Sequence, residues 1–116
     1  MLFKENRLRK KKDFETVMKS KDSRALAVSF LAGRFLANGL TLSRIGFVVS
    51  KKVSKKAVER NKAKRRLREA ARSMIGKIRT GFDIVVFTRQ RITESDFSSI
   101  KQNLETLLKK AGLLTN

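Results

Sequence analysis

The densest group of chemically active side chains lies in residues 51–72, KKVSKKAVERNKAKRRLREAAR. This stretch holds 11 Lys or Arg and two acidic residues, so its net charge of +9 is almost half of the chain's +19. Like charges three or four residues apart on a helix repel one another. A bound polyanion relieves that repulsion, and each phosphate neutralised by Lys or Arg also releases a condensed counterion. The segment therefore predicts a phosphate-binding surface with salt-dependent affinity.

The same stretch has the pattern of a helix that runs from about Val58 to about Ile78 and stops near Gly81. Basic residues on a solvated helix are usually interleaved with Glu, so an arc without any acid favours binding over mere solvation. The apolar residues cover about a third of the circumference, as expected for a helix that packs on a sheet: Ala63, Leu67, Ala70, Ala71, Met74 and Ile78. The acid-free arc lies beside them: Asn61, Lys64, Arg65, Arg68 and Arg72.

Composition limits the chemistry that the protein can carry out by itself. The chain has no Cys and no His, which removes thiol nucleophiles, zinc sites and the commonest general base. Its 10 acidic residues show no paired spacing at a strand end, and neither a GxGxxG motif nor a Walker loop is present. We therefore expect no catalysis by protein side chains and no metal site made of protein ligands alone.

Length and hydropathy fit one domain. With 116 residues and 41% hydrophobic content, the chain can bury one modest core, and no linker or repeat divides it, so a single domain over residues 1–116 is expected. No apolar run approaches the roughly 18 residues of a membrane span, and the Trp typical of membrane-binding helices is absent. The N-terminus lacks the apolar segment of a secretory signal. We expect a cytoplasmic protein whose partner is nucleic acid rather than a membrane.

The N-terminal part of the chain is predicted to be a basic arm followed by a short helix. Residues 4–12 hold six Lys or Arg and one Glu. Asp13 is expected to be the N-cap of the helix, because Asp favours that position. Phe14, Val17 and Met18 follow at helical spacing and form its apolar side.

The remaining elements are predicted to be strands and one more helix. Residues 25–32 alternate as one extended strand, Asn38-Gly39 predicts a hairpin turn, and the apolar run 45–50 predicts a strand in the middle of a sheet. Residues 83–88 form a second buried strand, and since a helix joins the two, one parallel pair is expected. The last helix, residues 95–114, has an apolar stripe: Phe97, Ile100, Leu104, Leu107 and Leu108.

Elimination favours RNA as the nucleic acid. The sequence has no helix-turn-helix, zinc pattern or leucine heptad that would present the basic helix to a DNA groove. Phe14, Met18 and Phe30 are candidates for stacking on unpaired bases, although each is equally well explained as core. A ribosomal-type structural protein and a DNA-compacting protein remain as alternative functions.

The basic helix also carries a recognisable motif. Arg60-Asn61, Lys64-Arg65 and Arg68-Glu69, preceded by Val49-Ser50-Lys51-Lys52, resemble the RNxxKRxxRE signature of the bacterial ribonuclease P protein component. The similarity continues in the family's order along nearly the whole chain: Arg7-Leu8, Asp13-Phe14, Val17, Arg44-Ile45-Gly46, Asp83-Ile84-Val85-Val86 and Arg89.

This resemblance implies a fold and a function. The expected fold is a small α/β (α+β) two-layer sandwich with a four-stranded mixed sheet, αβββαβα order and a left-handed βαβ crossover, against the usual handedness. The expected function is that of a protein subunit, monomeric by itself, that binds the ribonuclease P RNA and the 5′ leader of precursor tRNA in a cleft between the first helix and the sheet. Chemistry in that family belongs to the RNA and to Mg²⁺ bound mainly by the RNA.

The resemblance and the helical arc together predict two sets of contact residues. The set for the RNA subunit is Lys51, Lys52, Arg60, Asn61, Lys64, Arg65, Arg68 and Arg72. The set for the leader is Arg9, Lys12, Phe14, Met18 and Phe30. Three positions depart from the family's habit: Met18 replaces a second aromatic, Ser54-Lys55 occupies a turn often built with glycine, and Arg66 replaces an apolar residue.

Overall fold

The computed structural model describes residues 4–88 and 96–115, and its elements follow the expected αβββαβα order. A short 3-10 turn, η1, precedes the first helix, and another, η2, follows the second. The bounds are η1 Lys4–Asn6, α1 Lys11–Lys19, β1 Arg24–Ala27, β2 Leu31–Ala37, β3 Arg44–Val48, α2 Ala57–Met74, η2 Ile75–Lys77, β4 Phe82–Thr88 and α3 Phe97–Lys110.

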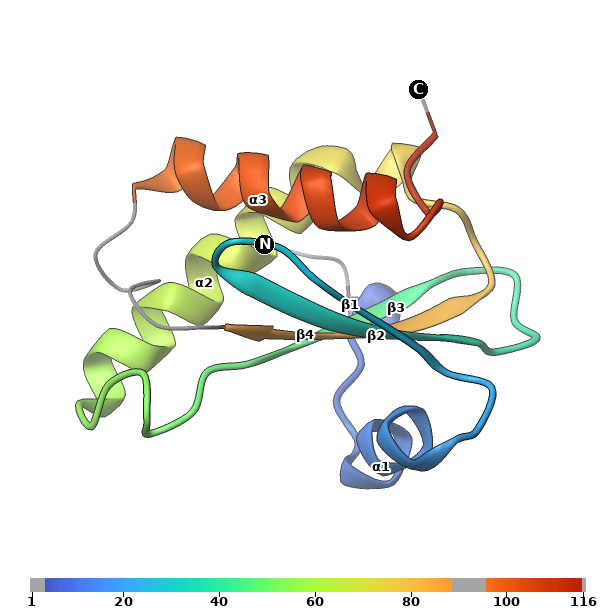
Figure 1. Ribbon diagram of the computed structural model, residues 1–116, viewed down its shortest axis with the longest axis horizontal. Coiled ribbons are helices and arrows are strands. Elements are labelled where there is room, and N and C mark those ends of the chain that lie inside the picture. The colour runs from blue at the N-terminus through green and yellow to red at the C-terminus, as the bar shows by residue number, and fades with distance from the viewer. Residues whose placement is uncertain (1–3, 89–95, 116) are drawn as a thin grey trace.

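The four strands form one mixed sheet with the order β1-β2-β4-β3. The β1·β2 and β2·β4 pairs are antiparallel and the β3·β4 pair is parallel, which confirms the parallel pair predicted from the connecting helix. Helices α2 and α3 cover one face of the sheet, and this makes the predicted two-layer sandwich (Figure 1). Helix α1 lies against the other face (Figure 1). The handedness of the β3-α2-β4 crossover stays a prediction.

Helix α2 packs through the stripe that its sequence predicts. All six predicted core positions are buried, although Ile78 lies just beyond η2 rather than in the helix. The helical region ends at Lys77, where η2 gives way to the extended Ile78, so the predicted stop near Gly81 is a few residues too late. Gly81 lies in the turn before β4, with a φ of 89° in the left-handed region that glycine tolerates. The apolar arc therefore holds α2 on the sheet and leaves the basic arc outside.

Strand β4 is the centre of the fold. Ile84 and Val86 point into the core beneath α2 and α3, whereas Val85 points into the smaller core beneath α1. These three side chains have no exposed surface. A strand covered on both faces needs a continuous apolar run, as the sequence predicted for residues 83–88.

The single strand predicted for residues 25–32 is wrong, because the segment contains a tight reversal. β1 ends at Ala27, β2 begins at Leu31, and the Val28 N–H donates to the Leu31 carbonyl at 2.8 Å. The Phe30 N–H donates to Asn103 Oδ1 of α3 at 3.3 Å instead of joining a strand ladder. Alternation continues through this reversal, so periodicity alone could not reveal it.

The hairpin predicted at Asn38-Gly39 is also wrong, although a turn is present. Gly39 has a φ of 70°, but the strands on either side of the turn, β2 and β3, are separated by β4. Consequently β3 lies at the edge of the sheet rather than in its middle. The N-terminal arm covers that edge, because the Leu8 N–H donates to the Ile45 carbonyl at 3.0 Å.

Asp13 is not the N-cap of α1, because the helix begins at Lys11 and Lys10 takes the N-cap position. The Asp13 carboxylate instead lies 3.4 Å from Arg44 Nη1. Arg44 also donates to both oxygens of the buried Asp83 at 2.9 and 2.7 Å, and this hydrogen bonding raises the pKa of Arg44. Arg44 thus ties α1 to the central strand.

Helix α3 begins and ends inside the predicted range. Asp96 is its N-cap, and Gly112, with a φ of 74°, follows its last residue, Lys110, and Ala111. Ser95, the predicted start, lies outside the described residues. Four residues of the predicted stripe are buried and Phe97 is 42% exposed. None of the helices in the described ranges has the length and apolarity to cross a bilayer.

Candidate nucleic-acid interface

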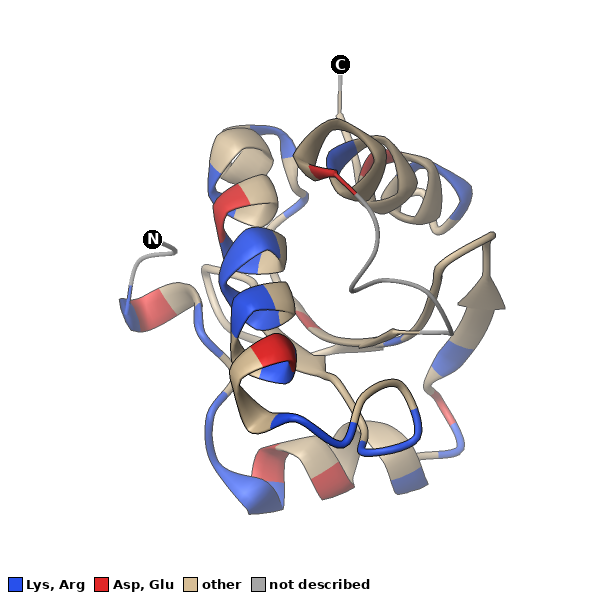
Figure 2. Cartoon of the chain, turned by 90° about the vertical axis from the view of Figure 1, so that its left-hand side faces the viewer, with Lys and Arg blue, Asp and Glu red and all other residues tan. Residues whose placement is uncertain are grey.

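The basic arc of α2 forms one side of the molecule and continues into the loop before the helix (Figure 2). Asn61, Arg65 and Arg72 are exposed on the arc, and Lys64 and Arg68 are half-buried. Lys51 and Lys52 are exposed in the loop, and Arg60 is half-buried at the start of the helix. The structure therefore brings the predicted RNA-subunit residues together on one surface.

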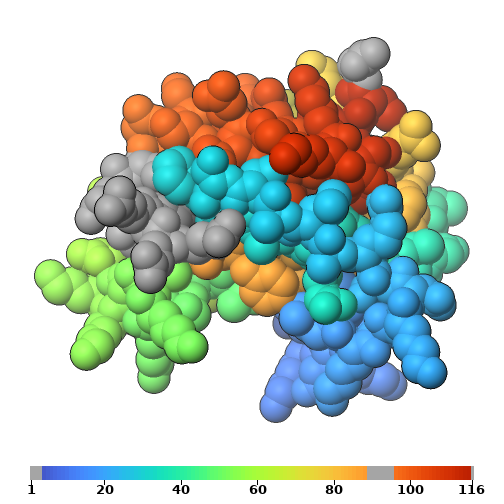
Figure 3. Space-filling view, in the orientation of Figure 1, coloured from blue at the N-terminus to red at the C-terminus, as the bar shows by residue number. Residues whose placement is uncertain are grey.

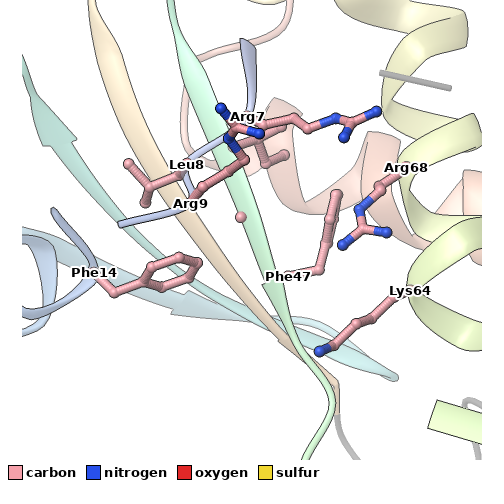
Figure 4. Close-up of a pocket in the computed structure, with 9 residues that line it drawn as sticks. Arg7, Leu8, Arg9, Phe14, Phe47, Lys64 and Arg68 are labelled. Atoms are coloured by element: carbon pink, nitrogen blue, oxygen red, sulfur yellow. The ribbon is translucent and has the colours of Figure 1, made fainter. Parts of the chain in front are cut away.

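Beside this arc, a pocket of about 250 Å³ opens between α2, the edge of β3 and the N-terminal arm. Arg68 and Lys64 reach into it from α2, and Arg7 approaches from the arm (Figure 4). Burial lowers the pKa of Arg68, and the charge of Arg7 lowers it further. The complete lining contains four cations and no acid: Arg7, Leu8, Arg9, Phe14, Ile45, Gly46, Phe47, Lys64 and Arg68. Its electrostatics suit a phosphate group.

Leu8 is the anchor that brings the arm to this pocket. Its side chain is 4% exposed and packs with Val17 and Val85 in the core beneath α1. Asn6 Nδ2 adds a hydrogen bond to the Ser43 carbonyl at 2.9 Å. With Leu8 buried, Arg7 and Arg9 on either side of it line the pocket. Arg7 was not predicted as a contact residue, although the sequence has a signal for it: one apolar residue, Leu8, stands between two arginines in an otherwise basic arm.

Phe14 has a fixed place between α1 and β3. Its ring lies against Gly46, where any Cβ would collide with it, and it packs on the core beneath α1. Phe14 thereby also lines the cationic pocket, with Arg9 of the arm. Met18, farther along α1, is 38% exposed. Lys12 is exposed in the first turn of the same helix.

Phe30 does not join Phe14. It packs against the core beneath α2 and α3, on the opposite face of the sheet from α1. The expectation that Phe14 and Phe30 share one surface is therefore wrong. The reason is the reversal between β1 and β2, which places Phe30 beside α3.

The sheet face on the α1 side has an apolar depression of about 350 Å³. Its surface is made mostly of small side chains, with Phe87 of β4 and one arginine: Ala25, Leu26, Ala27, Ala32, Gly33, Arg34 and Phe87. In the space-filling view, a hollow separates α1 from the green segment that contains the loop before α2, and orange β4 lies above it (Figure 3). Phe87 thus has the position that the sequence had assigned to Phe30.

A family model described as Ribonuclease P matches residues 2–112. The chain belongs to the ribonuclease P protein family. A ribonuclease P protein component from Caldanaerobacter subterraneus subsp. tengcongensis is 37% identical over 92% of this chain and 90% of its own length. One from Thermotoga petrophila is 42% identical over 90% of each chain.

Solved structures agree with this assignment. The structure of the RNase P protein from Staphylococcus aureus is similar, with a TM-score of 0.83, 31% identity and coverage of 95% of this chain and 98% of the other. That of Thermotoga maritima has a TM-score of 0.79 and 39% identity, and covers 90% of this chain and 96% of the other. This ribonuclease P protein therefore shares both the sequence and the fold of the family. Arg89, part of the resemblance, lies outside the described residues.

Proposed function

We propose that this ribonuclease P protein acts as the protein subunit of the ribonucleoprotein that removes the 5′ leader of precursor tRNA, and that it joins the complex as a monomer. The observation that carries the proposal is the acid-free basic arc of α2, which continues into a pocket lined by four cations. A surface of this charge needs a polyanion, and family membership makes ribonuclease P RNA that polyanion.

The arc of α2 and the loop before it contact the RNA subunit. Arg65 and Arg72 are exposed and present planar guanidinium groups that bind phosphate oxygens in pairs. The half-buried Lys64 and Arg68 hold a phosphate that enters the pocket. Each neutralised phosphate releases counterions, so the complex weakens as salt rises.

The leader lies on the α1 side of the sheet. The alanines of the apolar depression leave room for bases, and Phe87 and Met18 offer surfaces for stacking. Arg9 and Lys12 at the N-terminal side neutralise leader phosphates, and Phe14 lines the cationic pocket. This arrangement keeps the leader close to the RNA subunit while the protein offsets the repulsion between the two RNAs.

Mg²⁺ is expected to be bound mainly by the RNA partner, where it activates the attacking water and stabilises charge on the scissile phosphate. No group of three potential metal-ligating side chains is found in the described ranges of this chain. The protein's own share is electrostatic: its cations bring two polyanions together and so lower the Mg²⁺ concentration that assembly requires.

Single-turnover cleavage of precursor tRNA by in vitro transcribed bacterial ribonuclease P RNA tests the proposal. We expect the protein to restore cleavage at a low Mg²⁺ concentration at which the RNA alone is slow. A precursor with a one-nucleotide leader is the matched control, because it removes the leader contacts and keeps the tRNA body. Unchanged cleavage of the full-length precursor at low Mg²⁺ would contradict the proposal.

A further inference from the structure

The loop between β3 and α2 is rich in lysine over residues 50–56. We call it the lysine loop. Four of its seven residues are lysines, and all four are exposed: Lys51, Lys52, Lys55 and Lys56. Such a loop repels itself, and without restraint its lysines would occupy many arrangements. Ordering them on an RNA surface would then cost conformational entropy.

Ser54 restrains this loop through three hydrogen bonds. Its hydroxyl donates to Glu59 Oε2 at 2.6 Å and accepts from the Lys56 N–H at 3.2 Å. Its carbonyl accepts from Arg60 Nη1 at 2.9 Å. Glu59 and Arg60 both lie in the first turn of α2, so the loop is fastened to the helix that follows it.

The other end of the loop is fastened as well. The Val53 N–H donates to the Ser50 carbonyl at 3.0 Å, which closes a turn over the first two lysines. The Val53 side chain is partly buried against the main core. The lysine loop is therefore held by an apolar contact on one side and by the Ser54 network on the other.

Apart from this hydrogen bond, the negative charge of Glu59 is unfavourable for binding RNA. Its carboxylate lies in a segment of net charge +9 whose partner is a polyanion, and a negative charge there weakens the attraction. Its first-turn position suits the dipole of α2, but any acid in that turn would do the same. Only the bond from Ser54 requires an acceptor at residue 59.

We propose that Glu59 and Ser54 are positioning residues that hold the lysine loop in the conformation that binds the RNA subunit. Arg60, predicted as an RNA contact, contributes one of its donors to the same restraint. Because the loop is already ordered, it loses less conformational entropy when it binds RNA phosphates. The hydrogen bonds of Ser54 therefore raise the affinity for RNA. This inference rests on the proposed function, because the RNA subunit is its ligand.

Two substitutions of Glu59 separate position from charge. Glu59→Gln and Glu59→Ala each remove one negative charge, so the gain in attraction to RNA and the loss at the helix dipole are equal. Only Gln keeps an oxygen that accepts from Ser54. We expect the alanine variant to bind in vitro transcribed ribonuclease P RNA about threefold to tenfold more weakly than the glutamine variant, the range of one hydrogen bond. Equal affinities would overturn the inference.

A double-mutant cycle identifies the partner. Ser54→Ala should weaken RNA binding in the wild-type background and have a much smaller effect in the Glu59→Ala background, because the bond is already absent. Independent, additive effects would show that Ser54 and Glu59 do not act together. Melting temperatures of the same variants report the structural role: if the Glu59 pair differs in melting temperature but not in affinity, the network only stabilises the fold and the inference fails.

The wild-type protein separates this inference from the proposed function. If wild type neither binds ribonuclease P RNA nor promotes leader removal, the proposed function fails. If wild type does both and the two Glu59 variants bind equally well, only the positioning role fails.

Discussion

Helices α2 and α3 pack on the sheet in the same way but differ in how their charged residues are distributed. Both bury an apolar stripe on the same face of the sheet, and they pack against each other. On the side of α3 next to the end of α2, Lys101, Glu105 and Lys109 alternate in sign at four-residue spacing, which is the pattern of a solvated helix. The outer arc of α2 contains no acid. Burial therefore explains why both helices fold, and the excess of positive charge is larger on α2 than on α3.

The N-terminal ends of the two helices also differ, because only α3 has a capping side chain. Asp96 caps α3 by accepting a hydrogen bond from the Ser99 N–H at 2.8 Å. The N-cap of α2 is Lys56, whose side chain makes no capping bond. A lysine at that position gives up local stability in order to extend the basic surface. The cap of α3 therefore stabilises its own helix, whereas the N-cap position of α2 adds a positive charge and no capping bond.

The largest effect that would test this difference is expected from removing two charges of the α2 arc. Arg65→Ala with Arg68→Ala should lower the affinity for ribonuclease P RNA about 100-fold, because each lost charge-assisted contact is worth about 1.5–3 kcal/mol before compensation by neighbours. Filter binding at fixed salt measures the loss.

The matched control for that double variant is Lys101→Ala with Lys109→Ala on α3, which removes the same net charge. We expect it to change the affinity less than about threefold, because these lysines flank the acidic Glu105 and lie off the arc. Equal losses from the two double variants would mean that only net charge matters. A drop in melting temperature above about 10 °C in the α2 variant would mean that the arc is structural.

The salt dependence of RNA binding should also differ between the α2 and α3 double variants, but by less than the affinity itself. Each phosphate contact contributes about 0.7–0.9 to the slope of log affinity against log salt, so losing Arg65 and Arg68 should flatten the slope by about 1.4–1.8. Between 50 and 200 mM salt, the ratio of the wild-type affinity to that of the Arg65→Ala, Arg68→Ala variant should therefore fall about tenfold. The α3 double variant should keep the wild-type slope. A shared slope would remove the distinction between the two surfaces.

Phe87 and Phe30 extend the comparison to the two faces of the sheet. Phe87→Ala should weaken binding of precursor tRNA by the assembled enzyme about fivefold to tenfold, because stacking on one base is worth about 1–3 kcal/mol. Phe30→Ala removes the same side chain from the opposite face and should leave that affinity unchanged. Binding of tRNA that lacks a leader is the reference. A leader-dependent loss with Phe30→Ala alone would reverse the assignment of the faces.

The contrast between these residues also explains what the sequence could predict. Positions on α2 depend on their own helix, since Leu67 and Arg68 are adjacent in sequence yet fall on different faces through helical geometry alone. That is why helical periodicity alone predicted both the buried stripe and the basic arc of α2. Strand β4, buried on both faces, was predictable for a similar reason: its continuous apolar run is a local signal.

Features that depend on distant segments were not predictable from local patterns. β3 is an edge strand because β4, some forty residues away, lies between it and β2. The N-terminal arm forms one side of the pocket beside α2. The arm is held against β3 because Leu8 packs on Val85 and its N–H donates to the Ile45 carbonyl. Asp13 resembles a cap in the sequence, but the distant Arg44 uses its carboxylate. In each case a long-range contact, which no local period encodes, decided the outcome.

The smallest predicted effect concerns the cap of α3 and should be purely structural. Hydrogen bonding from Ser99 lowers the pKa of Asp96, and the charge of Arg66 contributes. A carboxylate whose pKa is lower in the folded state stabilises the fold above its unfolded pKa, and this contribution is lost as the pH falls through the folded value. Asp96→Ala should therefore lower the melting temperature by a few degrees at pH 7, and the difference from wild type should shrink toward pH 3.

Asp96→Asn refines this prediction, because it keeps an oxygen that can accept from the Ser99 N–H but loses the charge. Its melting temperature should lie between those of wild type and the alanine variant at pH 7, and it should vary less with pH than that of wild type. Affinity for ribonuclease P RNA should stay within about twofold of wild type for both variants, since Asp96 lies on the stabilising helix. A tighter complex with both variants, in proportion to the lost negative charge, would instead extend the RNA-binding surface onto α3 and weaken the division of labour between the two helices.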